Sequence, residues 1–140
     1  MPPAEMPFLM RLGGRLAAAF AAGAGLLLVL AALGVGSFGI AGRPVASGEW
    51  LRVAGPLFLA MGVLMAVIAY GFRARKRWSR HVVMVLWTTV AVYGVAVGVT
   101  GRVPAALAWR AALQAVGLGA LAAWYFYRNA DVVAYFRGLG

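Results

Sequence analysis

The sequence predicts an all-α, polytopic membrane protein with four transmembrane helices in an up-down bundle. Hydrophobic residues make up 64% of the 140 residues, charged residues only 11%, and the mean hydropathy is +0.89. An ordinary soluble domain is about 45–50% apolar and about 25% charged. Four long runs carry no charge, and basic residues gather in the short segments between them, as at the ends of membrane spans. The charge-free runs are residues 16–42, 53–72, 82–101 and 111–127.

The first run predicts a transmembrane helix over residues 15–38, preceded by an interfacial N-terminal segment, residues 1–14. A membrane-spanning helix needs about 20 apolar residues, so this run is longer than required. A signal peptide is the competing interpretation, with Arg11 and Arg15 as its basic region. The apolar part of a signal peptide is about 7–15 residues long, and the length of this run therefore favours a span.

The next two runs have the length of a span and predict helices over residues 53–72 and 82–101. The fourth run is short, but Pro104 suits the first turn of a helix. We therefore expect the fourth span over residues 105–127. A further short helix is expected over residues 129–138, where Asn129 or Asp131 provides an N-cap. It is too short to span and has apolar residues, so it is expected to lie along the membrane interface.

The distribution of Arg and Lys predicts the orientation, because short cytoplasmic loops are enriched in these residues. One side of the predicted bundle carries nine of them and the other side four. Both termini lie on the nine-residue side, which predicts a bacterial cytoplasmic (inner) membrane protein with cytoplasmic N- and C-termini. Trp50 and Trp109 are expected at the outer interface, and Trp78 and Trp124 at the inner one. The nine are Arg11, Arg15, Arg73, Arg75, Lys76, Arg77, Arg80, Arg128 and Arg137; the four are Arg43, Arg52, Arg102 and Arg110.

Small residues at four-residue spacing predict where the helices pack. Membrane helices associate through close backbone approach, which small side chains allow. Gly94 and Gly98 form a GxxxG pattern on the third span. Ala111, Ala115 and Gly119 form a similar ridge on the fourth.

The residues inside the spans do not support catalysis. The acids are Glu5, Glu49 and Asp131, all outside the predicted spans, and there is no cysteine. Enzymes need positioned acids, bases, nucleophiles or metals, so we expect a non-enzymatic protein with no catalytic residues, no metal site and no cofactor. His81 is the single histidine. It is expected to be an interfacial side chain, with axial ligation of haem or chlorophyll as the alternative.

Two polar residues are predicted inside the fourth span. Arg110 and Gln114 are four residues apart and therefore share a helix face. Gln114 must find a hydrogen-bond partner, because an unsatisfied amide in hydrocarbon costs several kcal/mol. One hypothesis is that it joins two helices, with Tyr93, Thr88 and Thr89 as candidate partners. The other is a polar pocket that opens to the outside together with Glu49.

The turn between the second and third spans is the densest basic feature. Its main role is expected to be fixing the topology. A second expectation is contact with anionic lipid, since basic clusters beside a membrane helix attract it. Nucleic-acid binding is not expected, because the cluster is one short turn against the bilayer. The basic residues of this turn are Arg73, Arg75, Lys76, Arg77 and Arg80.

Two segments resemble small bacterial four-helix inner-membrane proteins of unassigned function. The first is this basic turn, which runs from YGF at residues 70–72 to WSR at residues 78–80. The second is the ending, with WYFYR at residues 124–128 and VVAYF at residues 132–136. The resemblance implies the same four-helix architecture and a bacterial membrane, and it implies no active site.

These observations favour an accessory or structural subunit of a larger membrane complex, whose partners are other membrane proteins and anionic lipids. The alternative is a small transporter or channel for an anionic or polar solute, using the Arg110 and Gln114 face. A coupled transporter normally carries a carboxylate or histidine within its spans, and none is predicted here. An enzyme or pigment carrier built on His81 is the least favoured hypothesis.

Overall fold

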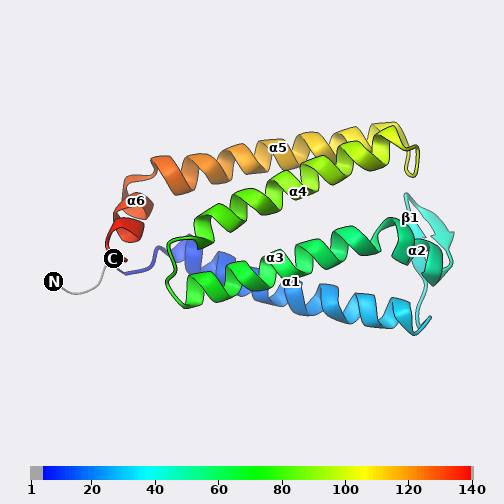
Figure 1. Ribbon diagram of the computed structural model, residues 1–140, viewed down its shortest axis with the longest axis horizontal. Helices are drawn as coiled ribbons and strands as arrows, with labels where there is room; N and C mark the ends of the chain where they lie inside the picture. Colours follow the sequence, from blue (N-terminus) through cyan, green and yellow to red (C-terminus); the bar gives the residue numbers. More distant parts are fainter. Residues whose placement is uncertain (1–4, 140) are drawn as a thin grey trace.

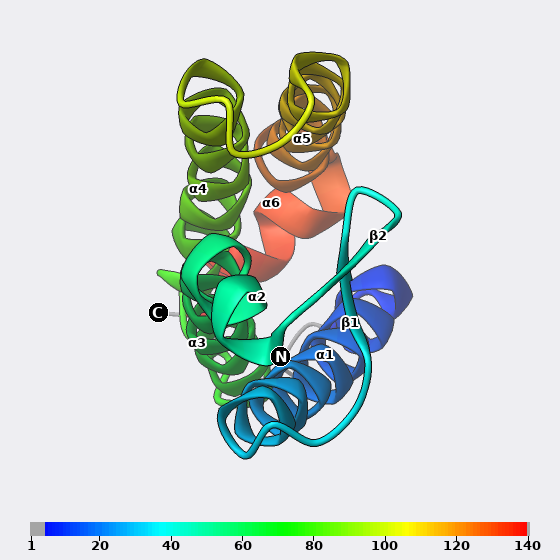
Figure 2. The same ribbon diagram turned by 90° about the vertical axis from the view of Figure 1, so that its right-hand side faces the viewer.

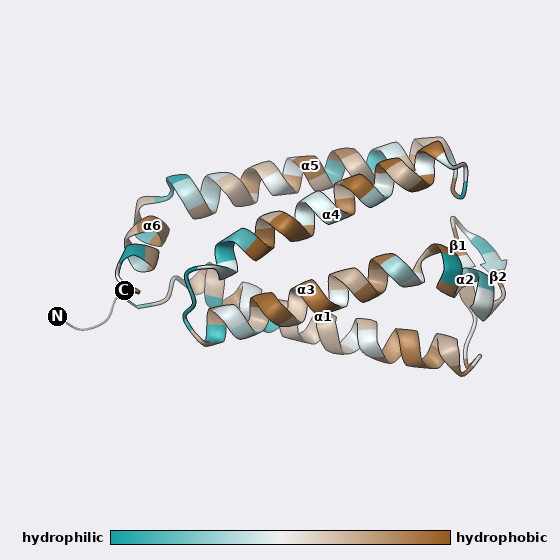
Figure 3. Ribbon diagram, viewed as in Figure 1, coloured by the Kyte–Doolittle hydropathy of each residue, from teal (hydrophilic) through white to brown (hydrophobic). Residues whose placement is uncertain are grey.

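The computed structural model describes residues 5–139 and shows a bundle of four long helices (Figure 1). These helices are long and apolar enough to cross a membrane, and apolar residues recur along all four of them (Figure 3). The protein is therefore an all-α, multi-pass membrane bundle. Residues 1–4 of the expected N-terminal interfacial segment lie outside the described residues. The four long helices are α1 (Phe8–Ala32), α3 (Gly55–Arg73), α4 (Ser79–Val99) and α5 (Ala105–Arg128).

The long helices alternate in direction and form two pairs. α1 packs along α3, α4 packs along α5, and α3 joins the pairs by contacting α4. Figure 2 looks along the bundle and shows α1 and α5 in different pairs. Each of these two helices therefore packs mainly on one neighbour and leaves much of its surface open. We call the end with the start of α1 and the α3–α4 turn the terminal end, and the opposite end the hairpin end (Figure 1).

α1 begins and ends earlier than the predicted span 15–38. The helix starts directly after Pro7, whose carbonyl accepts hydrogen bonds from the backbone N–H groups of Met10 and Arg11. Residues 8–14, expected in an interfacial segment, are thus its first two turns. Beyond Ala32 the chain leaves the helix at Gly34 and Gly36, which have φ angles of 69° and 109°. These left-handed conformations favour glycine and stop the helix short of residue 38.

The segment that joins α1 to α3 contains ordered structure that the sequence did not predict. Strands β1 (Phe38–Ile40) and β2 (Arg43–Val45) form an antiparallel hairpin, followed by the short helix α2 (Ser47–Val53). The two-residue turn Ala41-Gly42 has positive φ at both residues, 52° and 80°, as a type I′ turn requires.

Trp50 differs from its predicted interfacial position, because it is buried within the hairpin end at 6% exposure. Its ring lies between those of Phe38 and Phe58, with centroids 5.3 and 5.2 Å away. The aromatic cluster fixes α2 and the hairpin on the bundle. By contrast, Trp109 and Trp124 are exposed near the two ends of α5, which agrees with interfacial positions.

The remaining helix bounds differ from the predicted ones by three residues or fewer. The last helix, α6 (Ala130–Arg137), is capped by Asn129, whose side-chain oxygen accepts from the backbone N–H groups of Asp131 and Val132 at 3.1 and 3.3 Å. Its apolar surface does not face lipid as expected. Val132, Tyr135 and Phe136 are at most 2% exposed and belong to the core of the terminal end, so α6 closes that end of the bundle (Figure 1).

Candidate functional site

The α4–α5 contact is built on small residues, as their spacing predicted. A Cβ atom added at Gly98 would lie 2.9 Å from the Cβ of Ala108, and one at Gly94 would lie 3.3 Å from the Cβ of Ala112. Ala115 continues the contact and is buried. The backbones of α4 and α5 therefore approach more closely than larger side chains would permit.

The residues of α5 that pack on α4 differ in part from the predicted ridge of Ala111, Ala115 and Gly119. Ala108, Ala112 and Ala115 are buried against α4, whereas Ala111 is exposed. Gly119, the last predicted member, does pack on α4: a Cβ added there would lie 3.1 Å from the Cβ of Trp87. Ala111 instead lines a largely apolar cavity of about 350 Å³ between the two helix pairs at the hairpin end, together with Trp50.

The α3–α4 turn is held by a glycine that the spacing analysis did not single out. A Cβ added at Gly71 would lie only 2.7 Å from the Cβ of Ser79 and 3.0 Å from the Trp78 ring. Ser79 is fully buried and its hydroxyl donates to the carbonyl of Lys76 at 2.7 Å. Gly71 and Ser79 are close in sequence and lie on either side of a basic turn. This is the one feature of the sequence that indicates their close approach.

The five basic residues of this turn do not form a single anion-binding patch. Arg77 donates from Nη2 to the carbonyl of Arg137 at 2.8 Å, which ties the turn to the end of α6. Arg80 places its guanidinium over the rings of Tyr127 and Phe136, with its carbon 5.1 and 5.4 Å from the two centroids. Arg73, Arg75 and Lys76 are exposed and make none of these contacts with α6.

Tyr135 on α6 is an unusual buried group. Its hydroxyl is buried and has no hydrogen-bond partner among the described residues, and the same holds for the Nε of Arg80. Burial raises the pKa of the Tyr135 phenol, and the positive charge of Arg75 opposes part of that rise. Closing the bundle with α6 therefore leaves polar groups in an apolar environment, which costs free energy.

His81 lies at the start of α4 and is exposed. Its Nδ1 shares a hydrogen bond of 2.6 Å with the Tyr127 hydroxyl on α5. One ring nitrogen is thus occupied by an interhelical contact, as expected of an interfacial histidine. Ligation of a haem or chlorophyll by His81 stays a prediction. Within residues 5–139 there is no group of three or more His, Cys, Asp or Glu side chains that could hold a metal ion.

Arg110 and Gln114 are both exposed on α5, and neither lines any of the cavities described for this bundle. Glu49 is exposed on α2 and lies with Arg52 and Arg102 around a separate open depression at the hairpin end. The predicted polar pocket joining Arg110, Gln114 and Glu49 is therefore not formed within the described part of the chain.

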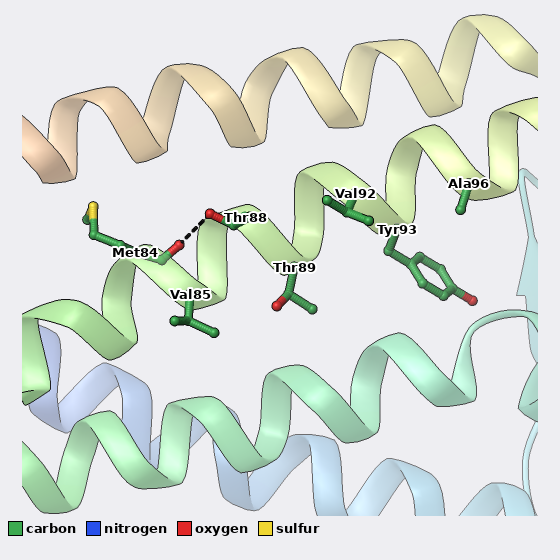
Figure 4. Close-up of a pocket in the computed structure, with 7 residues that line it drawn as sticks. All are labelled: Met84, Val85, Thr88, Thr89, Val92, Tyr93 and Ala96. Atoms are coloured by element: carbon green, nitrogen blue, oxygen red, sulfur yellow. Dashed lines mark hydrogen bonds between the residues drawn. The ribbon is translucent and has the colours of Figure 1, made fainter.

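The residues considered as hydrogen-bond partners for Gln114 are directed elsewhere. A groove of about 500 Å³ lies along α4. Figure 4 shows the residues that line it, among which Thr88 donates to the carbonyl of Met84 at 2.9 Å. Tyr93 lies further along the same groove, and its hydroxyl donates to the carbonyl of Val53, the last residue of α2. Neither residue bonds to Gln114, whose amide makes no hydrogen bond to another described residue.

Comparisons with known protein families, curated proteins and solved structures find no match to this chain. The fold and the positions of its polar residues define the class: an integral membrane protein with four spans and a closed terminal end. The resemblance to small bacterial inner-membrane proteins stays a prediction.

Proposed function

We propose that this protein is a non-enzymatic accessory subunit of a larger complex in a bacterial cytoplasmic membrane. The observation that carries the proposal is Gln114, an exposed amide near the middle of α5 with no partner among the described residues. In hydrocarbon an unsatisfied amide costs several kcal/mol. A helix of another subunit that offers a hydrogen bond removes this cost.

The surroundings of Gln114 support a helix as its partner. Seven residues before it, Leu107 lines the cavity between the helix pairs, and seven residues after it, Leu121 is 65% exposed. Apart from Arg110, one turn before the amide and near the start of α5, the face is therefore largely apolar. Gly117, one turn further, has no atom within 4 Å of an added Cβ. A small residue beside a polar one is the composition typical of membrane helix interfaces.

The proposed orientation has cytoplasmic termini. It is supported by the nine basic residues at the terminal end against four at the hairpin end, in accordance with the positive-inside rule. The bacterial origin is supported by the resemblance alone.

The non-enzymatic character is supported by the composition of the spans. The four spans contain no Asp, Glu, Cys or Lys apart from their ends, and His81 is engaged by Tyr127. A catalytic mechanism needs at least one positioned acid, base, nucleophile or metal.

The test is purification of the tagged protein from its native membrane in a mild detergent, with identification of every co-purifying chain. We expect other membrane polypeptides at constant ratio. The Gln114→Leu variant should retain them about fivefold less, since an interhelical hydrogen bond of this kind contributes about 1–2 kcal/mol. Thr88→Val is the matched control, because it removes a polar group that bonds only within α4, and it should retain the partners.

The alternative is a small transporter or channel that uses the Arg110 and Gln114 face. It predicts that the protein purifies alone, as a monomer or homo-oligomer, with a polar cavity enclosing Gln114. That result would replace the accessory-subunit proposal.

A further inference from the structure

A pocket of about 400 Å³ at the terminal end combines basic and apolar residues from α1 and α3. Three arginines line it: Arg11 and Arg15, one turn apart on α1, and Arg73, the last residue of α3. All three are exposed. No carboxylate lines the pocket, and three carboxylates in the whole sequence cannot neutralise thirteen basic residues. The pocket therefore carries a concentrated positive charge.

The remaining walls of the pocket are apolar, and the side chains on its floor are small. Met10 and Phe72 are buried at 2% and 5% exposure and form part of the core. Gly14 lies directly on Phe72, since a Cβ added there would be 3.5 Å from the Phe72 Cβ. Ala18 and Ala69 complete the floor. A ligand in this pocket meets arginines on one side and hydrocarbon on the other.

We propose that this pocket binds the phosphate headgroup of an anionic phospholipid. Arginine pairs with phosphate oxygens through two parallel N–H···O bonds, which favours the phosphate group over other anions. The arginines stand at the ends of two spans, at the level of the lipid headgroups, where their long side chains reach the polar region.

The shape of α1 favours a lipid over a free phosphate ion. Further along the same helix face, toward the bundle centre, Ala22 and Gly25 are exposed and small. No atom lies within 4 Å of a Cβ added at Gly25. This leaves a shallow track beside α1 that an acyl chain attached to the headgroup can follow, and it would give no advantage to a free ion.

The site differs from the basic turn that the sequence singled out. Arg77 and Arg80 of that turn are engaged with α6, and Arg75 and Lys76 do not line this pocket. Only Arg73 belongs to both. The proposal does not depend on the accessory-subunit function, because a lone monomer would carry the same pocket.

Native mass spectrometry of the full chain, purified in detergent with equal amounts of phosphatidylglycerol and phosphatidylcholine, tests the proposal. Phosphatidylglycerol should be retained in preference. Arg11→Gln/Arg15→Gln should lower its retention by roughly tenfold, since each basic residue near a membrane surface contributes substantially to binding of anionic lipid. Arg75→Gln/Lys76→Gln is the matched control: it removes the same charge at the same end, but neither residue lines the pocket, so the lipid should be retained within about twofold.

A second variant separates loss of the pocket from loss of charge or of folding. Ala18→Trp fills the floor, keeps all three arginines and replaces an exposed residue, so it should also lower retention of phosphatidylglycerol. Glycerol phosphate is added as the competing free anion and should not displace the lipid. Equal retention of phosphatidylcholine, equal loss in the control, unchanged retention in Ala18→Trp, or displacement by glycerol phosphate would each overturn the proposal.

Discussion

Individual side chains at the terminal end have roles that their chemical type alone does not indicate. Arg80 belongs to a basic run, yet its guanidinium packs on Tyr127 and Phe136. Such cation–π contacts contribute about 0.5–2 kcal/mol, the larger values applying when the pair is desolvated. Tyr135 is an aromatic residue in a short amphipathic helix, yet it is 2% exposed and its hydroxyl has no described partner. Both residues hold α6 on the bundle.

Tyr135 makes the stability of the terminal end sensitive to alkaline pH. Burial raises the pKa of its phenol above the ordinary value of 10.0. Below the unfolded pKa both states are protonated, and the full stability is present. As pH rises above about 10, the unfolded chain loses the proton more readily than the folded one, so stability falls until pH passes the folded pKa.

The Tyr135→Phe variant should remove this contribution. At pH 8 its Tm in detergent should equal or exceed that of the natural protein, because no hydrogen bond is lost and an unpaired buried hydroxyl is removed. Between pH 9 and 11 its Tm should fall less than that of the natural protein. All other residues are the same in the two proteins, so their contributions cancel in the comparison. Parallel curves over this range would refute the role of the Tyr135 phenol.

For single residues, the sequence predicted which glycines lie in a helix contact better than it predicted the partners of charged side chains. Gly94 and Gly98 could be predicted because helices that approach closely carry small residues four positions apart. The engagement of Arg77 and Arg80 with α6 could not be predicted, because it depends on how a helix some fifty residues later folds back on the turn. Gly71 was missed for a related reason: its neighbour Ser79 belongs to the next helix.

At the scale of elements, the α4–α5 contact depends on close backbone approach at Gly94 and Gly98. Gly98→Leu should destabilise the protein by about 1–3 kcal/mol, since the added side chain must enter space occupied by Ala108 and overpacking costs this much. Gly94→Leu should act similarly against Ala112. Gly117→Leu, on the open face of the same pair, is the matched control.

The measurement is thermal unfolding of all three variants in the same detergent, monitored by circular dichroism. Gly98→Leu and Gly94→Leu should unfold at clearly lower temperature than the natural protein, and Gly117→Leu should remain near it. If Gly117→Leu loses as much as the other two, the destabilisation comes from substituting any membrane glycine and the packing account is wrong.

α3, α4 and α5 were predicted to within three residues, because apolar length and a proline at a helix start act locally. α5 begins directly after Pro104, as predicted, whereas α1 begins directly after Pro7 and therefore seven residues before its predicted start. The β1–β2 hairpin was missed because its turn, Ala41-Gly42, lacks the Asn or Asp that usually marks a type I′ turn. The apolar face of α6 was assigned to lipid because amphipathicity indicates a buried face without identifying what covers it.

For the whole molecule, the up-down arrangement brings both described chain ends to the same end of the bundle. The distribution of basic residues along the sequence then predicts that this end is cytoplasmic. Ser79 lies beside the basic turn but is unsuitable for labelling, because it is fully buried. Ala134 on α6 and Ala46 before α2 are exposed, and neither carries charge.

Single-cysteine variants at these two positions test the orientation in a chain that has no native cysteine. A membrane-impermeant thiol reagent added to intact spheroplasts should label Ala46→Cys and should leave Ala134→Cys unlabelled until the membrane is opened. Labelling of Ala134→Cys from outside, with Ala46→Cys protected, would reverse the topology.

The open faces of α1 and α5 and the unpaired amide of Gln114 lead to the central claim, that another membrane polypeptide covers α5. Site-specific photocross-linking in the native membrane tests it most directly. A photoreactive amino acid in place of Leu121, on the Gln114 face, should form a discrete adduct with a second, different polypeptide. The same group in place of the buried Leu86 should form none. If Leu121 yields only lipid adducts, the face is covered by the bilayer alone and the claim is contradicted.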